Sequence, residues 1–167
     1  MVGGGRRTKR EVLRSGPGRF HADPGTEPTS YAADSVETAW LEVKAHAGEA
    51  RLNVRAFHAW RVVLPEGVIQ ELVDLRSHEE RERYRITQAE LEADPAPESV
   101  KELARRLRVE GKAGVMYRSV RNRPDGVCVA LFLEHIEEEL SVEPAEEEWD
   151  RLVQVTFSEQ RSKGREK

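Results

Sequence analysis

Residues 97–133 most constrain the fold, because a helical pattern is followed directly by two β-type runs. Pro97 suits the first position of a helix and Gly111 suits its end. The apolar residues between them recur at spacings of three and four and predict one buried stripe, formed by Val100, Leu103, Ala104 and Leu107. The runs "AGVMYRSV" and "GVCVALFL" flank "RNRPDG", whose Pro-Asp-Gly step is typical of a turn, so they predict a hairpin.

A second helical pattern lies between Asp34 and Gly48. Its predicted buried stripe consists of Val36, Ala39, Trp40, Val43 and Ala47. Asp34 can cap the free amides while Glu37 completes a capping box, and Ser35 is the alternative cap. We therefore give Glu37 a structural role.

The remaining segments mix strand and helix patterns. Residues 51–64 alternate as in a strand with one apolar face, and residues 151–157 alternate in the same way. "VIQELVDL" at 68–75 fits either a short strand or a helical turn, whereas "SHEE" at 77–80 is a capping-box pattern before a charged helix. Mixed short strands and helices predict an α+β fold.

The length of 167 residues fits one domain with its own core. We predict a loose basic segment at 1–15, a folded domain at 16–160 and a tail at 161–167. The net charge of −4 argues against broad binding to nucleic acid, and we interpret the acidic run 134–150 as a solvated face. The single cysteine, Cys128, excludes an internal disulfide and is expected to be a small buried side chain in a reducing compartment.

Several common functional patterns are missing from the sequence. The five histidines lack zinc-site spacing, so we expect no metal site. The glycines at 3–5 have neither a preceding strand nor the lysine of a phosphate loop, and no nucleophile elbow occurs. No signal-peptide pattern or membrane-spanning run is present, which makes the cytoplasm the expected location.

Four residues are candidates for a functional site. Arg19 lies in "GPGRF", where its guanidinium could hold phosphate or ribose oxygens or could simply pair with a surface carboxylate. Tyr31 is expected on a short strand before the helix, either as a core aromatic or as a stacking face. Glu42 lies on the flank of the helix stripe, where it can face a cleft between helix and sheet. Ser119 ends a β-type run in "YRSVR".

The order Arg19, Tyr31, Glu42, Ser119 resembles the RES domain family, named for its arginine, glutamate and serine. The phrases "GRF", "PTSYAADSVETAWLEV", "GKAGVMYRSVR" and "PDGVCVALF" carry the resemblance over most of residues 16–133. This family is found mostly as toxins of bacterial toxin–antitoxin pairs and is similar to ADP-ribosyltransferases. The resemblance implies a single α+β domain with two small sheets, flanking helices and an NAD cleft between the sheets.

The resemblance also implies an activity: cleavage of the nicotinamide–ribose bond of NAD, with transfer of ADP-ribose to phosphate, water or a protein. Glu42 would stabilise the charge that develops on the ribose, and Arg19 would hold the pyrophosphate or adjoining ribose. Tyr31 would flank the nicotinamide, and Ser119 would hydrogen-bond the ribose or a phosphate. NAD is then the substrate, no metal is needed, and a cognate antitoxin is the expected protein partner.

Two other hypotheses compete with this one. The chain could be a catalytically silent module that keeps the fold and uses its charged surface to bind a protein. It could instead bind nucleic acid through "RRTKR" and "RSVRNR", although the negative net charge counts against this.

Overall fold

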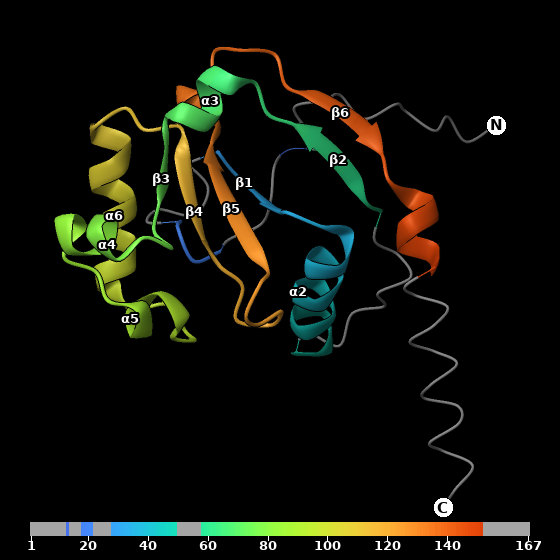
Figure 1. Ribbon diagram of the computed structural model, residues 1–167, viewed down its shortest axis with the longest axis horizontal. Helices are drawn as coiled ribbons and strands as arrows, with labels where there is room; N and C mark the ends of the chain where they lie inside the picture. Colours follow the sequence, from blue (N-terminus) through green and yellow to red (C-terminus); the bar gives the residue numbers. More distant parts are fainter. Residues whose placement is uncertain (1–12, 14–17, 22–27, 50–57, 152–167) are drawn as a thin grey trace, which may run out of the picture.

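The computed structural model describes residue 13 and residues 18–21, 28–49 and 58–151. Two β-sheets and several helices make up these ranges (Figure 1). The strands are β1 (Thr29–Ala33), β2 (Trp60–Val63), β3 (Leu72–Asp74), β4 (Gly114–Arg118), β5 (Val127–Phe132) and β6 (Ser141–Pro144). The helices are α2 (Val36–Glu49), α3 (Glu66–Gln70), α4 (His78–Tyr84), α5 (Gln88–Glu92), α6 (Glu98–Val109) and the 3₁₀ turn η2 (Leu133–His135).

The larger sheet has the strand order β1-β5-β4-β3. β5 is antiparallel to both β1 and β4, and β3 is parallel to β4, so β1, β4 and β3 all run in one direction. The smaller sheet is the antiparallel pair of β2 and β6. The predicted α+β fold with two small sheets and flanking helices is therefore confirmed.

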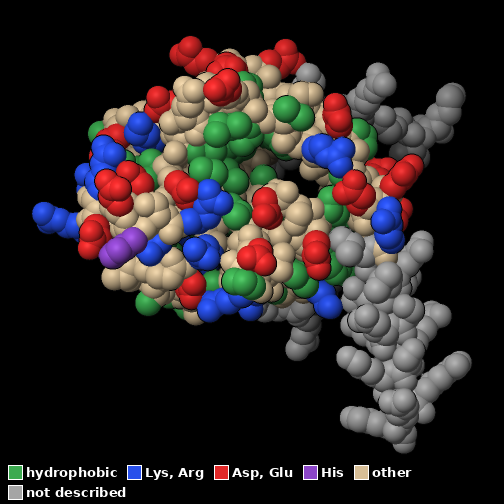
Figure 2. Space-filling view, in the orientation of Figure 1, with side chains coloured by type: hydrophobic (Ala, Val, Ile, Leu, Met, Phe, Trp, Pro, Cys, Tyr) green, Lys and Arg blue, Asp and Glu red, His purple; other side chains and the backbone are tan. Residues whose placement is uncertain are grey.

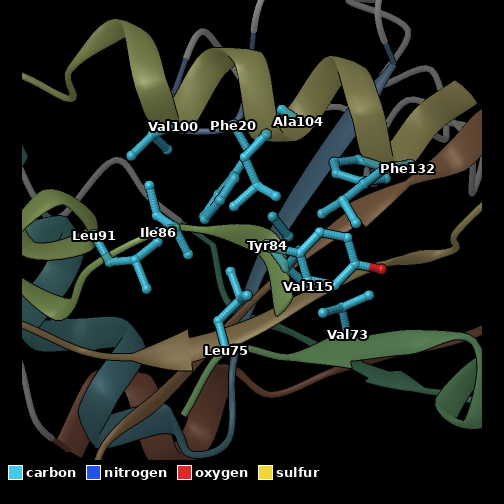
Figure 3. Close-up of a cluster of buried hydrophobic side chains, with 13 residues drawn as sticks. Phe20, Val73, Leu75, Tyr84, Ile86, Leu91, Val100, Ala104, Val115 and Phe132 are labelled. Atoms are coloured by element: carbon cyan, nitrogen blue, oxygen red, sulfur yellow. The ribbon is translucent and has the colours of Figure 1, made fainter. Parts of the chain in front are cut away.

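The main hydrophobic core fills the space between α6 and one face of the larger sheet (Figure 3). The helix stripe predicted from its spacing is fully buried there, at Val100, Leu103, Ala104 and Leu107. Because successive strand residues face opposite sides, Val115 and Phe132 join this cluster, whereas Met116 and Leu131 join a second cluster on the other face. The second cluster also takes in Val62 and Val142, which attaches the smaller sheet.

α2 packs in a third hydrophobic cluster, apart from the two described above. Its central contact is between Trp40 and Trp149, which meet in a T-shaped arrangement with ring centroids 5.1 Å apart. Its N-terminus is capped by Ser35, whose Oγ accepts a hydrogen bond of 3.1 Å from the amide of Thr38. Of the two caps considered, the structure therefore has Ser35, and the predicted capping box of Asp34 with Glu37 is wrong because the helix starts one residue later, at Val36.

Several expectations need correction at the level of single elements. Residues 68–75 contain both alternatives, the end of α3 and then β3. Pro97 is the N-cap of α6, which begins at Glu98, so it precedes the helix instead of opening it. Ser77 caps α4 by accepting a hydrogen bond from the amide of Glu80, but the predicted capping box is incomplete because the Ser77 amide donates to the carbonyl of Asp74 and not to the Glu80 side chain.

Three other segments differ from expectation in extent or in structure. The predicted strand 51–64 is present as β2 at its C-terminal end, while residues 51–57 lie outside the described ranges. Residues 146–151 are helical, so the strand predicted from residue 151 onward does not begin there, and 152–157 are outside the described residues. The acidic run 134–150, expected only as a solvated face, contributes β6 to the smaller sheet. The predicted domain limits at residues 15 and 160 stay predictions.

Candidate active site

The candidate site lies at the end of the larger sheet where β1 and β4 terminate and where β5, which lies between them, begins. Two residues separate the end of β1 from the start of α2, and the loop 119–126 follows β4. In Figure 1 this loop lies between α2 and α5. This end of the sheet brings together residues far apart in the sequence, from α2, from the loop after β4 and from the start of β5.

Glu42 of α2 and Ser119 of the loop are in direct contact. Ser119 Oγ donates a hydrogen bond of 2.6 Å to Glu42 Oε1, and Cys128 Sγ of β5 donates a longer one of 3.7 Å to the same oxygen. Ser119 and Cys128 are buried, whereas Glu42 is half-buried. Two donors therefore engage one carboxylate oxygen, and no hydrogen bond to the other oxygen is present among the described residues.

Backbone amides fix the orientation of the Ser119 hydroxyl. Its oxygen accepts hydrogen bonds from the amides of Arg121 (3.1 Å) and Asn122 (2.9 Å). Because both lone pairs are then used, the hydroxyl hydrogen is left to point at Glu42.

Tyr31 supports the short loop that carries Arg19. The Tyr31 hydroxyl accepts a hydrogen bond of 2.9 Å from the amide of Phe20 and lies 3.1 Å from His21 Nδ1. A Cβ at Gly18 would lie only 2.6 Å from the Tyr31 ring, so the backbone of the Arg19 loop rests directly on the aromatic ring. The half-buried Arg19 guanidinium donates to the carbonyl of Ala93, 2.6 Å away.

Tyr117 of β4 is paired in register with Cys128 of β5, and its ring packs on Phe20 with the centroids 5.0 Å apart. Burial raises the pKa of its phenol well above the ordinary value, and nearby Cys128, Tyr31 and Glu42 raise it further while Arg19 lowers it. Tyr117 therefore neighbours Cys128, which contacts Glu42, on one side and Phe20, which follows Arg19, on the other; no hydrogen bond joins Arg19 to Glu42 within the described ranges. The structure thus brings Glu42 to Ser119 and Tyr31 to the Arg19 loop, with Tyr117 between.

Further arginines line the rim of this site. Arg121 and Arg123 extend from the loop after Ser119 to Asp94 (3.5 Å) and Glu92 (2.6 Å), respectively. Arg19 reaches the same segment at Ala93. The stretch 92–94 therefore contacts three guanidinium groups at the mouth of the site, where an anionic ligand would compete with it.

Cys128 is buried, as expected, but its role beside Glu42 was not foreseen. Alternation along β5 places Cys128 on the same face of the sheet as Ala130 and Phe132, so the face could have been inferred from the sequence. The contact with Glu42 could not. Thr38 and Asn122 were also missed as site residues. Their side chains join across the site by a hydrogen bond of 2.9 Å from Asn122 Nδ2 to Thr38 Oγ1, which no local pattern signals.

The Cys128 thiol is expected to resist alkylation in the native protein. Burial, and then the charge of Glu42, raise its pKa from 9.0 to about 12. At pH 8 we expect iodoacetamide to react much faster with the urea-unfolded chain than with the native one. Equal rates in both states would contradict this environment.

The same shift predicts a pH dependence of stability. The folded state holds the thiol proton more tightly, so this contribution is complete below pH 9 and is lost as pH rises toward about 12. Urea unfolding of the wild type and of Cys128→Ala across this window should show the steeper decline in the wild type. A steeper decline in Cys128→Ala would have the wrong sign.

A separate cavity of about 620 Å³ lies between β1 and α2 on one side and β2 with residues 145–149 on the other. Figure 2 shows the hollow on this face beside exposed apolar side chains. Tyr31 is among its lining residues, whereas Arg19, Glu42 and Ser119 are not. A cavity between the two sheets is therefore present, as the resemblance implies for the NAD cleft, but three of the four candidate residues lie outside it.

Neither metal binding nor a membrane span is indicated by the described parts of the chain. No group of three or more His, Cys, Asp or Glu side chains in the ranges given above could hold a metal ion. Within those ranges, no helix has both the length and the apolar character needed to cross a bilayer.

Comparison with known proteins agrees with this fold. The sequence profile of the RES domain matches residues 6–153. No curated protein sequence matches the chain. A chain in the crystal structure of the M. tuberculosis MbcT–MbcA toxin–antitoxin complex is similar with a TM-score of 0.59 and 18% identity, covering 87% of this chain and 81% of that one.

The likeness to that structure defines the class, an α+β domain whose fold also occurs in a toxin–antitoxin complex. The profile match covers most of the sequence, and the chain belongs to the RES domain family. The resemblance seen in the residues around Arg19, Tyr31, Glu42 and Ser119 is therefore confirmed as a family relationship.

Proposed function

We propose that the chain is an NAD-consuming toxin of a toxin–antitoxin pair. Its membership of the RES family and the likeness of its fold to a chain of the MbcT–MbcA complex support the toxin class. The observation that carries the proposal is the hydrogen bond of 2.6 Å from Ser119 to Glu42, because it joins the two residues that the resemblance matches to the family's glutamate and serine.

The proposed reaction breaks the bond between C1′ of the ribose and the nicotinamide nitrogen. The bonding electron pair leaves with nicotinamide, and positive charge develops on the ribose. A carboxylate next to that carbon stabilises the charged transition state more than the neutral ground state of the sugar, which lowers the barrier. Glu42 would supply this carboxylate, with Oε1 held by Ser119 and Cys128 and Oε2 available for the ribose.

The other candidate residues would bind and orient NAD. Arg19 would exchange the carbonyl of Ala93 for the pyrophosphate or the adjoining ribose. Tyr31 would flank the nicotinamide while its hydroxyl holds the Arg19 loop. Ser119 would contact the ribose or a phosphate by exchange: it would give up the hydrogen bond from the Arg121 amide to accept one from a ribose hydroxyl, or the one to Glu42 to donate to a phosphate.

Phosphate, water or a protein nucleophile would then add to C1′ and receive the ADP-ribose group. No bound metal takes part in this scheme. A cognate antitoxin would block the site until release, and the whole system would operate in the cytoplasm.

The proposal is tested by incubating the purified chain with NAD, with and without phosphate, and measuring released nicotinamide. Release that requires phosphate would identify a phosphorylase, and release without it a hydrolase. Labelled NAD in a cell extract would reveal transfer to protein. Absence of release under all three conditions would reject the enzyme and favour a silent interaction module of the same fold.

A further inference from the structure

The loop 119–126 is attached to α2 at two points, and the second point has no assigned function. The first is the hydrogen bond from Ser119 to Glu42, and the second is the hydrogen bond of 2.9 Å from Asn122 Nδ2 to Thr38 Oγ1. Thr38 and Glu42 are four residues apart, so they lie one above the other on the same face of the helix. The two bonds are therefore about one helical turn, roughly 5–6 Å, apart.

Both ends of the second attachment are themselves held firmly. Thr38 is 1% exposed, and its hydroxyl lies 2.8 Å from the Ser35 hydroxyl that caps α2. At the other end, the amide of Asn122 donates to Ser119 Oγ and its carbonyl accepts a hydrogen bond of 2.8 Å from Gly126. One residue, Asn122, thus contacts the serine through its backbone and the helix through its side chain.

Two hydrogen bonds to α2 fix the orientation of the loop relative to the helix, which one hydrogen bond cannot do. Ion pairs of Arg121 and Arg123 also join the loop to Asp94 and Glu92, but neither reaches α2. With the bond between Ser119 and Glu42 as its one contact to α2, the loop could pivot against the helix about that bond, and the carboxylate could follow it. A second bond one turn away fixes the tilt of the loop relative to the helix. The position of Glu42 relative to bound substrate then depends on Asn122, although Asn122 does not contact Glu42 in the structure.

We propose that Asn122 is a positioning residue for Glu42 and acts through Thr38. This inference rests on the proposed function, since it concerns the rate of NAD cleavage. Misplacement of a catalytic group by about 1 Å can cost on the order of a hundredfold in rate. We therefore expect Asn122→Ala to lower kcat by roughly ten- to a hundredfold while KM for NAD changes little.

The test compares kcat and KM for nicotinamide release among four variants: Asn122→Ala, Thr38→Val, Thr38→Ser and the double variant Asn122→Ala/Thr38→Val. Thr38→Val removes the hydroxyl at nearly constant shape and should reduce kcat at least as much as Asn122→Ala does, since it also removes the contact with Ser35. Thr38→Ser restores a hydroxyl and should recover most of that loss. The double variant should be no slower than Thr38→Val alone, because Thr38→Val already removes the contact with Asn122.

A matched control separates positioning from loss of stability. Gln70→Ala removes an exposed amide from α3, where it bonds only within its own helix to Glu66, and should leave kcat unchanged. Rates are taken per folded molecule, with the folded fraction measured by circular dichroism at the assay temperature. A lower folded fraction with unchanged kcat would show that Asn122 is merely structural and would overturn the proposal.

Other outcomes are equally decisive. If the losses in the double variant multiply, or if Thr38→Ser is as slow as Thr38→Val, the contact between Asn122 and Thr38 is not the cause. A wild-type chain without nicotinamide release would reject the proposed function, and this inference with it. An active wild type with a fully active Asn122→Ala would reject this inference alone.

Discussion

Glu42→Gln is expected to lower the rate of nicotinamide release by roughly 10²–10³-fold, the range seen when one preorganised electrostatic contact to a transition state is removed. Glutamine has nearly the same shape, and its carbonyl oxygen can still accept the hydrogen bond from Ser119. Only the negative charge is lost. NAD affinity should change much less than the rate, because positive charge on the ribose develops only in the transition state.

The control for this variant is Glu37→Gln, the same change of charge on the exposed side of the same helix. It should retain wild-type turnover. Thermal unfolding of both variants, compared with the wild type, checks that the fold persists. If Glu42→Gln stays within about threefold of the wild type, well under the expected loss, the charge of Glu42 does not drive the reaction.

Gly114→Ala is expected to have the largest effect on stability. Gly114 has φ +154°, and a Cβ there would lie 2.1 Å from the carbonyl oxygen of Ala130 on the paired strand β5. Since the obstructing atom belongs to the backbone of a central strand, it cannot move without separating β4 from β5. We expect the free energy of unfolding to fall by about 3–5 kcal/mol, a large part of what a domain of this size has.

Gly111→Ala is the matched comparison. Gly111 follows α6 with φ +73°, but a Cβ there has no atom within 4 Å. Its cost should be limited to the left-handed backbone, about 1–2 kcal/mol. Urea unfolding of both variants measures the difference, and equal losses would mean that the clash at Gly114 is relieved by movement of the strands.

The parts of the fold that depend on local sequence could be predicted. The α6 stripe and the β4–β5 hairpin were predicted because their apolar residues follow one period without interruption and a Pro-Asp-Gly turn joins the strands. Ser77 was recognisable as a cap for α4 because capping depends on residues three positions apart.

Elements formed by distant residues were missed. β6 has only Ser141, Val142, Glu143 and Pro144, too few apolar residues for a strand pattern, and it exists because β2 pairs with it. β3 is three residues long and is held by β4, about forty residues later in the chain, so its own sequence could not distinguish it from a helical turn. Tertiary pairing determines the secondary structure in both cases.

The candidate site likewise contains residues that the sequence indicated and residues that only the tertiary structure shows. Glu42 and Ser119 were selected together through the family resemblance, and the structure places them in contact. Asn122 looked like part of a turn and Thr38 like one more residue on the helix. Their contact spans 84 positions of the chain, and only the packing of the loop on α2 makes it visible.

A crystal structure of the Glu42→Gln variant with NAD bound would show whether Glu42 lies beside the scissile bond. We expect the nicotinamide ribose within hydrogen-bond distance of the substituted side chain at position 42 and of Ser119, with the Arg19 guanidinium on the pyrophosphate or adjoining ribose. NAD bound in the cavity between α2 and β2, away from position 42, would contradict it.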